Sequence, residues 1–359
     1  MLSSVMLTAY RTFRKLRVDG LSRVNLFVGK NNAGKTSLLD AIELLVLGNA
    51  WALFRSSMRR GEEAPSIDEE ERQMVRRDLA ISHQFFGHVI EGAHFSISGT
   101  PGPKSVTCQI IEVTSERSVA EPDLFGLAQL GPSLAISFLS GSSPGPVVLP
   151  LLPTGAISSE ARRRISLAPV ESSAAANFLR PESIETPRLN ALWDSIALKP
   201  EENKVVEALQ IIEPSIERIA FLGERRLRRG VFLKLRDSDQ RLPIGNVGDG
   251  LKRLLALSLN LIAARGGYLF VDEIDTGLHF TVMENMWRLV IETAKALDVQ
   301  VFATTHSLDC VNSLASVHGD RQISEIDVAL HRIERDLDHT VRYSVQEITV
   351  AARRHVEMR

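Results

Sequence analysis

Residues 29–36 read Gly29-Lys30-Asn31-Asn32-Ala33-Gly34-Lys35-Thr36 and match the phosphate-binding pattern GxxxxGK[ST] in full. The apolar run Val24 to Val28 comes directly before them and predicts a buried strand. The residues that follow, Ser37 to Val46, carry apolar side chains at helical spacing. Strand, glycine-rich loop and helix are contiguous, as the pattern requires, so we expect the loop N–H groups and the helix N-terminus to cradle phosphates.

The same loop supplies a cation and an oxygen ligand. Lys35 is expected on the β- and γ-phosphate oxygens, and the Thr36 hydroxyl on Mg²⁺. A turn that merely precedes a helix would explain the glycines, but not a lysine and a threonine at these positions. The predicted phosphate-binding residues are Gly29, Asn31, Asn32, Ala33, Gly34, Lys35, Thr36 and Ser37.

A second apolar run, Tyr268 to Val271, ends in the acidic pair Asp272 and Glu273. This is the Walker B arrangement, in which the aspartate serves Mg²⁺ and the glutamate lies beside the attacking water. We therefore predict Asp272 as a metal ligand and Glu273 as the catalytic base. The alternative is an acidic strand-to-helix turn, because acidic residues are common at helix starts.

A third apolar run, Val299 to Ala303, leads into Thr304-Thr305-His306-Ser307, with one predicted helix between it and the acidic pair. A histidine here is placed to contact a γ-phosphate, so we predict His306 as a catalytic residue that holds the water and Glu273 in line. The alternative is a structural histidine at a strand end.

Bulk composition excludes several classes of protein. The formal net charge is −2, from 42 basic and 44 acidic residues, so no field of the whole molecule favours nucleic acid or an anionic membrane. The two cysteines, Cys108 and Cys310, are far apart and predict neither a disulfide framework nor a zinc site. There is no signal-peptide pattern, and no apolar run is long enough to span a bilayer. We expect a cytoplasmic protein with no membrane partner.

The order of predicted elements favours an α/β protein. From Val5 to Val28 and from His94 to Val113 the pattern is of short strands, and after residue 250 helices and strands alternate, which predicts a parallel sheet. Residues 130–153 are rich in Gly, Pro and Ser and predict an irregular connection, with mostly helical structure over 160–222. The densely charged stretch 55–77 predicts a solvated helix or loop, with a basic contact surface as the alternative.

The motifs together resemble those of ABC-type ATPases of the SMC, RecF and OLD group, and most of all the bacterial OLD-like ATPases. The resemblance rests on residues 29–36, Val247 to Lys252, Leu269 to His279 and Thr304 to Ser307. It covers about the first 50 residues and the chain from about Pro243 onward. It implies an ABC-type head with a parallel core sheet and an N-terminal β-meander in residues 1–125, a mostly helical inserted lobe in 126–225, and the rest of the head in 226–359.

The resemblance also implies a homodimer that closes over two Mg-ATP molecules. In this family the signature motif of one subunit covers the ATP of the other, and Asp275 matches the aspartate near the dimer seam. Gly248, Asp249 and Gly250 match the signature, but Gly248 replaces its serine and Asp249 its first glycine. Either Asp249 points away from the phosphates, or the N–H groups of the two glycines make the contact. A polar loop before a helix is the alternative.

The resemblance implies further positions and functions. Gln84 is a candidate for the residue that reports the nucleotide state, and Arg11 matches an arginine that the group often brings to the nucleotide. We expect an ATPase that acts as a switch in phage defence or DNA repair, with a nuclease-type effector encoded nearby and with DNA as a partner by resemblance. The alternative is an ATP-sensing scaffold with little turnover and no direct DNA contact.

Three other classes fit poorly. The longer OLD nucleases add a TOPRIM domain, for which the residues after His306 are too few. A GTPase would carry a guanine-reading NKxD pattern, which is absent from the sequence. A transporter ATPase would have a standard signature and a much shorter separation between Lys35 and Asp272.

Overall fold

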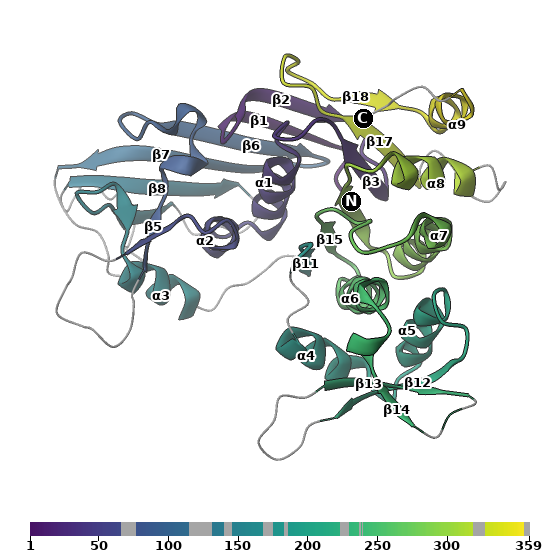
Figure 1. Ribbon diagram of the computed structural model, residues 1–359. Helices are drawn as coiled ribbons and strands as arrows, with labels where there is room; N and C mark the ends of the chain where they lie inside the picture. Colours follow the sequence, from purple (N-terminus) through teal and green to yellow (C-terminus); the bar gives the residue numbers. More distant parts are fainter. Residues whose placement is uncertain are drawn as a thin grey trace.

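The computed structural model describes residues 1–65, 77–114, 131–139, 146–167, 175–182, 186–222, 230–236, 238, 240–318 and 327–354. A six-stranded core sheet occupies the centre of the α/β half of the molecule (Figure 1). Its strands, in spatial order, are β11 (Ala176–Leu179), β15 (Tyr268–Val271), β16 (Gln300–Thr304), β3 (Val24–Val28), β17 (Val328–Arg332) and β18 (Val341–Tyr343).

The first five strands of this sheet run parallel, and β18 pairs antiparallel at the edge. The parallel core sheet predicted from the sequence is therefore confirmed. β3 lies between β16 and β17, so the strand before the glycine-rich loop has both of its neighbours near the other end of the chain.

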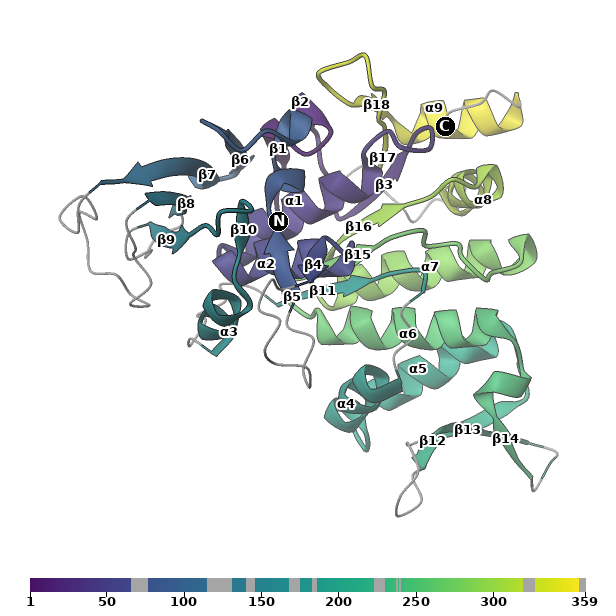
Figure 2. The same ribbon diagram turned by 60° about the vertical axis from the view of Figure 1, so that its left-hand side comes forward.

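Helices cover both faces of the core sheet (Figure 2). One face packs against α6 (Asp249–Ala263), α7 (Phe280–Ala296) and α8 (Leu308–His318), and the other against α1 (Lys35–Leu47) and α2 (Ala50–Arg59). Alternate residues of a strand point to opposite faces, so Leu269 and Val271 join the first core and Tyr268 and Phe270 the second. The sheet is buried on both sides, which explains why its strands are continuous apolar runs.

A row of stacked rings crosses the second face. Phe178 stacks on Phe270 with ring centroids 5.9 Å apart, and Phe270 on Phe302 at 5.5 Å. Phe302 in turn stacks on Phe27 at 6.3 Å. These contacts tie β11, β15, β16 and β3 together just below the strand ends that carry the predicted site.

A second, antiparallel sheet extends from the core sheet and forms the other half of the molecule (Figure 1). Its strands, in spatial order, are β2 (Phe13–Asp19), β1 (Ser4–Tyr10), β6 (His94–Thr100), β7 (Lys104–Val113), β8 (Gly131–Leu139) and β9 (Val147–Pro150). The predicted meander is present, but it is longer than the sequence suggested. The irregular connection predicted for 130–153 is wrong, because β8 and β9 lie there and continue the sheet.

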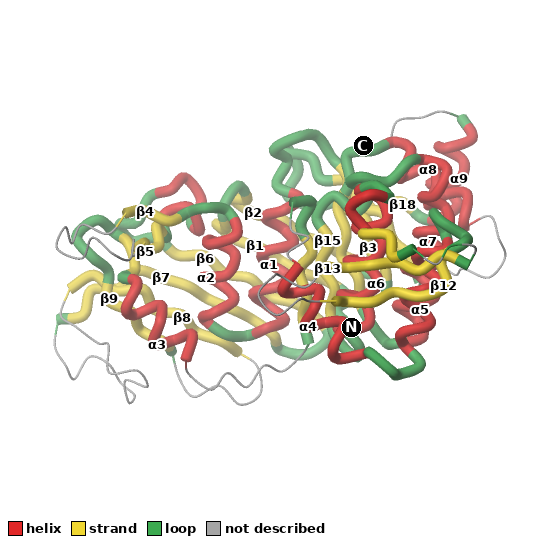
Figure 3. The backbone as a smooth tube through the Cα atoms, turned by 60° about the horizontal axis from the view of Figure 1, so that its bottom comes forward, coloured by secondary structure: helices red, strands yellow, loops and turns green. Residues whose placement is uncertain are grey.

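Smaller elements border the two sheets. Beside α2 lie β4 (Glu63–Pro65), β5 (Arg77–Ala80), β10 (Ala156–Ile157), the short 3₁₀ turns η1 (Ser82–Gln84) and η2 (Phe86–His88), and α3 (Ser159–Leu167). Below α6 lie α4 (Thr186–Ile196), α5 (Glu201–Gln210), a sheet of β12 (Ile216–Leu222), β13 (Gly230–Leu235) and β14 (Arg241–Pro243), and η4 (Ile244–Asn246). Figure 3 shows this group next to α6. Helix α9 (Val345–Arg353) packs on α8 and β17.

The middle of the chain is shared between these parts. Of its described elements, β8 and β9 join the antiparallel sheet, β11 joins the core sheet, and α4 and α5 pack on α6. The division of the chain after residues 125 and 225 remains a prediction. No helix in the described residues is long and apolar enough to cross a bilayer.

Candidate functional site

The three predicted motifs meet at one edge of the core sheet. In the parallel register Val271 pairs with Ala303, and Thr304 pairs with Phe27, so β15, β16 and β3 end at the same level. The glycine-rich loop, the acidic pair and the Thr-Thr-His-Ser segment follow directly from these ends. Ligands of parallel α/β sheets bind at the carboxyl ends of the strands, which makes this edge the candidate site.

The backbone of the loop requires glycine at two positions. Gly29 has φ +146°, and a Cβ there would lie 2.5 Å from the carbonyl oxygen of Ile333. Gly34 has φ +96°, and a Cβ there would lie 2.4 Å from the ring of Phe13. Gly34 is also the N-cap of α1 and makes no side-chain cap bond, so the first N–H groups of the helix are left for a ligand.

The Lys35 ammonium group holds the loop closed from inside. Its Nζ donates to the carbonyl oxygens of Gly29 at 2.6 Å and Lys30 at 3.0 Å, and it lies 3.2 Å from Nδ1 of His306. Burial lowers the pKa of Lys35 to about 8, although Asp272 and Glu273 act in the opposite direction. The lysine is therefore aimed across the loop, where phosphate oxygens would replace its present acceptors.

Two hydroxyl groups converge on the Asp272 carboxylate. The Thr36 hydroxyl donates to Oδ2 at 3.0 Å, and the Thr304 hydroxyl donates to Oδ1 at 2.6 Å. Oγ1 of Thr304 also accepts the Glu273 N–H at 2.9 Å. The two predicted metal ligands, Thr36 and Asp272, are thus brought together. Thr304, to which the sequence assigned no role, orients both acidic residues.

Glu273 and His306 lie at the open side of the site. Nε2 of His306 is 3.9 Å from Oε1 of Glu273, and the two side chains are 39% and 44% exposed. Burial and the Lys35 charge lower the pKa of His306, so a neutral ring is favoured. A neutral ring that accepts from Lys35 at Nδ1 carries its proton on Nε2, toward Glu273. This pair can exchange a proton with a water molecule at the γ-phosphate position.

Asp275, which is predicted to lie near the dimer seam, is hydrogen-bonded to the segment after β16 that also carries His306. Its Oδ1 accepts the Thr305 hydroxyl at 2.5 Å, and the Thr305 oxygen accepts the Ser307 N–H at 2.9 Å. The segment after Walker B and the Thr-Thr-His-Ser segment are therefore one hydrogen-bonded unit.

The signature segment forms the start of α6, on a different surface from the loop. Gly248 is the N-cap, and Asp249 and Gly250 open the helix. The Asp249 side chain is 82% exposed and pairs with Nζ of Lys252 at 2.8 Å, which lowers the pKa of Asp249. Across the described residues no hydrogen bond or ion pair joins 248–250 to the loop of the same chain.

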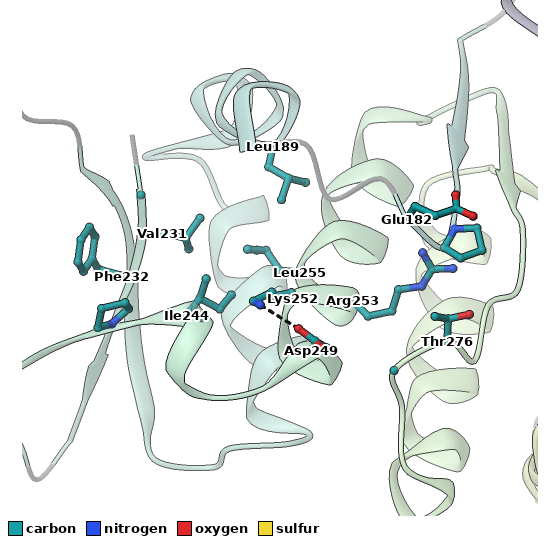
Figure 4. Close-up of a pocket in the computed structure, with 15 residues that line it drawn as sticks. Glu182, Leu189, Val231, Phe232, Ile244, Asp249, Lys252, Arg253, Leu255 and Thr276 are labelled. Carbon is teal, nitrogen blue, oxygen red and sulfur yellow. Dashed lines mark hydrogen bonds and ion pairs between the residues drawn. The ribbon is translucent and has the colours of Figure 1, made fainter. Parts of the chain in front are cut away.

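Gly250 packs against the segment after Walker B. A Cβ at Gly250 would lie 2.9 Å from the carbonyl oxygen of Gly277. Beside this contact lies a pocket of about 730 Å³, drawn in Figure 4. Its polar lining includes Glu182, Asp249, Lys252, Arg253 and Thr276. This pocket thus follows the signature helix and not the phosphate loop.

Arg253 is a buried residue that the sequence interpretation missed. It is 2% exposed, and its guanidinium group donates to the carbonyl oxygens of Asp272 and Glu273 at 2.8 and 2.7 Å. The available signal was a charged residue directly before the apolar run Leu254 to Leu257, in a helix predicted to pack on the core.

The candidate residues Gln84 and Arg11 lie in a buried ionic cluster instead. The Gln84 amide donates to Oγ of Ser57 at 2.5 Å, and Arg11 pairs with Glu62. Asp40 of α1 is in the same cluster and is 1% exposed. These contacts attach both residues to α1, α2 and Glu62, and not to the phosphate loop.

The solvated helix or loop predicted for the charged stretch 55–77 is wrong for its described part. Arg59 and Arg60 pair with the buried Asp40, and Arg55 with the buried Glu43. Residues 66–76 lie outside the described residues.

A smaller pocket of about 260 Å³ lies beside the phosphate loop, on the β17 side. It is lined by Lys30, Asn31, Ala33 and residues 332–336. Arg335 lines it and donates from Nε and Nη2 to the carbonyl oxygen of Asn32, at 2.9 and 2.7 Å. The loop after β17 therefore supports the phosphate loop from the side opposite Walker B.

Comparisons with known proteins agree with this arrangement. Residues 1–124 match the family model described as "AAA ATPase domain", and residues 149–311 match "AAA domain, putative AbiEii toxin, Type IV TA system". Over 354 residues the chain is 24% identical to an ATP/GTP phosphatase of Helicobacter pylori, with 92% of this chain and 90% of that protein covered.

Two further similarities are more limited. A 71-residue stretch is 38% identical to the DNA replication and repair protein RecF of Flavobacterium johnsoniae, and it spans 19% of this chain and 20% of RecF. The SMC head domain from Thermotoga maritima aligns with a TM-score of 0.46 and 15% identity, with 96% of this chain and 98% of that chain covered.

Proposed function

Since the chain is a P-loop ATPase of the AAA and SMC/RecF-like type, we propose that two copies close over Mg-ATP and that hydrolysis reopens them. The closed and open dimers act as a switch for a DNA-associated process, in phage defence or repair, through an effector partner. One observation carries the proposal: Lys35, Asp272, Glu273 and His306 converge at one strand edge while the catalytic pair stays open to solvent.

The residues of the edge fit a nucleoside triphosphate and its metal ion. Lys35 and the loop N–H groups bind the phosphates, and the small pocket beside Asn31 takes the nucleoside. Thr36 and Asp272 offer hard oxygen donors 3.0 Å apart, which suits Mg²⁺, and the ion when bound would neutralise charge on the phosphates.

Glu273 and His306 carry the proton chemistry. The Glu273 carboxylate accepts a proton from the attacking water, and Nε2–H of His306 donates to the γ-phosphate and keeps the water in line. Thr304 fixes the Glu273 backbone and the Asp272 carboxylate through one hydroxyl. A general base of this kind contributes about 10²–10⁴-fold to turnover.

The proposed dimer provides the cover over the site that this edge of the sheet lacks. Hydrolysis needs a site that excludes bulk water, and the exposed sides of Glu273 and His306 are not covered by the part of their own subunit that the structure describes. The start of α6 offers N–H donors without a side-chain cap, next to the exposed Gly248 and Asp249. Because Lys252 neutralises the Asp249 carboxylate, this helix start is able to approach the partner's triphosphate.

The printed names of two similar proteins support the wider role. RecF is described as a DNA replication and repair protein, and one matching family model names a toxin of a toxin–antitoxin system. The name of RecF supports DNA as a partner of the dimer. The name of the toxin family supports a role in defence together with a second protein. ATP turnover that rises on addition of duplex DNA would support DNA as a partner. Turnover that duplex DNA leaves unchanged over a range of salt concentrations would rule DNA out as a partner.

Light scattering with nucleotide titration tests the dimer. Glu273→Gln should bind Mg-ATP, turn over slowly and accumulate as a dimer, whereas Lys35→Ala should lose nucleotide binding and stay in the ATP-free state. Asp249→Trp places a bulky side chain at an exposed signature position and should block the dimer without weakening ATP binding. Asp249→Asn is its matched control and should still dimerise. If Asp249→Trp dimerises and hydrolyses ATP as the wild type does, the signature does not cover the partner's site.

A further inference from the structure

The guanidinium group of Arg253 is buried between the signature helix and the Walker B turn. Nη2 donates to the carbonyl oxygens of Asp272 and Glu273, and Nη1 donates to the carbonyl oxygen of Arg180 at 2.7 Å. Figure 4 shows the side chain leaving α6 and reaching past the pocket toward Glu182 and Thr276. One side chain thus joins α6 to the residues that end β11 and β15.

These bonds go to backbone oxygens and not to a carboxylate partner. Burial lowers the pKa of Arg253 to about 10, with Asp275, Asp272 and Glu273 acting in the opposite direction, so the group stays protonated at neutral pH. A buried charge is costly and contributes little stability compared with a well-packed apolar side chain. Its position therefore calls for an explanation beyond packing.

The backbone that Arg253 holds is strained. Glu273 has φ 49°, in the left-handed region that a residue with a side chain seldom adopts. Three contacts surround this residue: Arg253 binds its carbonyl oxygen, Thr304 accepts its N–H, and Thr276 donates to its carboxylate at 3.2 Å. Because the strained conformation directs the Glu273 side chain toward His306, the contacts that maintain it determine where the carboxylate lies.

We propose that Arg253 is a positioning residue for ATP hydrolysis, which holds the Asp272–Glu273 peptides so that the Glu273 carboxylate stays in line with the attacking water. The inference rests on the proposed role of Glu273 as the base. Arg253 is buried and contacts the backbone of the Asp272–Glu273 turn, so it acts through Glu273.

Arg253 also links that base to the predicted dimer contact. It lies on α6 a little less than one turn after Gly250, which packs against Gly277. A shift of the helix start when it meets the partner's nucleotide therefore moves the donor that holds the Glu273 carbonyl. The signature contact on one side of a subunit is thereby coupled to the base on its other side.

Steady-state kinetics of Arg253→Met and Arg253→Lys test the proposal. Arg253→Met keeps most of the buried volume and removes all donors, and it should lower kcat about 10- to 100-fold, the size expected from a small misplacement of a catalytic group. KM for ATP should stay within about twofold. Arg253→Lys keeps a cation and should fall between the wild type and Arg253→Met. The exposed Arg265, two residues beyond the last residue of α6, provides the matched control Arg265→Met, with unchanged kcat.

The double variant with Glu273→Gln separates positioning from general stability. If Arg253 acts through Glu273, Arg253→Met should lower the remaining turnover of Glu273→Gln by less than twofold. An equal fold-loss in both backgrounds would overturn the inference, and so would a rise in KM with unchanged kcat. Should Arg253→Met not fold, as thermal unfolding would show, the same comparison is made with Arg253→Lys.

The two proposals fail in different ways. If Glu273→Gln slows turnover and Arg253→Lys and Arg253→Met do not, the base assignment stands and the positioning role is wrong. If Glu273→Gln turns over at the wild-type rate, the base assignment fails, and the role of Arg253 fails with it.

Discussion

Replacing Thr304 by valine removes one hydroxyl group at nearly constant shape. Thr304 is fully buried, and its Oγ1 both donates to Asp272 at 2.6 Å and accepts the Glu273 N–H at 2.9 Å. The valine offers neither bond, and its methyl group keeps water out of the space. The substitution therefore tests whether one oxygen orients both acidic residues of the site.

The size of the effect follows from the two bonds. Leaving the Glu273 N–H without an acceptor costs about 1–3 kcal/mol, and a hydrogen bond to a carboxylate contributes about 1.5–3 kcal/mol. Asp272 keeps its contact with the Thr36 hydroxyl, so part of the second loss is recovered. We expect the free energy of unfolding to fall by about 2–4 kcal/mol, and kcat by at least about 10-fold as Glu273 loses its support.

Thermal unfolding and ATP turnover, measured on Thr304→Val and Thr304→Ser, provide the assay. A loss of about 2–4 kcal/mol corresponds to a fall in Tm of roughly 3–5 °C for a chain of this size. Thr304→Ser restores the oxygen and should recover most of both properties. Wild-type Tm and kcat in Thr304→Val would refute the argument, because the hydroxyl would then orient neither Asp272 nor Glu273.

Three other outcomes are expected. The pKa of His331 is lowered to about 3 because the ring is buried. Below pH 6.5 the unfolded state therefore binds a proton on this ring, whereas the native state does not. His331 thus costs stability as pH falls from 6.5 toward 3, by roughly 2 kcal/mol at pH 5, and His331→Gln should flatten unfolding curves measured across that window. A Cβ at Gly267 would lie 2.0 Å from the carbonyl oxygen of Ala175, so Gly267→Ala should push β11 from β15 and lower the free energy of unfolding by about 3 kcal/mol in denaturant titrations. A substitution without effect would mean that β11 moves freely. Arg335→Ala removes both donors to the Asn32 carbonyl and should raise the Kd for ATP several-fold in nucleotide titrations with kcat unchanged, whereas a loss of kcat alone would contradict a role in supporting the loop.

The edge of the core sheet was predictable because each motif directly follows a buried strand. Parallel strands end at one level, so the sequence alone predicts that Lys35, Asp272 and His306 lie near one another. The contacts of Thr304 and Arg253 were not predictable. Both act on backbone N–H or carbonyl groups, and no pattern of side chains in the sequence shows which backbone groups a buried donor will meet.

The errors in the fold have separate physical causes. β8 begins with Gly131 and Pro132 and lies next to residues rich in Gly, Pro and Ser. This composition is typical of a loop, so the strand was not recognised from its sequence. β11 has four residues, too few for a periodic pattern, and its pairing with β15 is decided by tertiary packing. The charges of α2 are buried because Asp40 and Glu43 of α1 supply partners, a pairing between two helices that the local composition does not reveal.

The central place of β3 delays formation of the core sheet until most of the chain has been synthesised. β3 leaves the ribosome early, but its neighbours β16 and β17 are synthesised some 270 or more residues later. Until then the strand is apolar and has two unpaired edges, a state that favours association with other chains. The strands β1, β2, β6 and β7 are local and can pair well before. A chain released before β16 is complete would therefore carry the whole glycine-rich loop, bind no nucleotide through it, and be a substrate for chaperones and proteases.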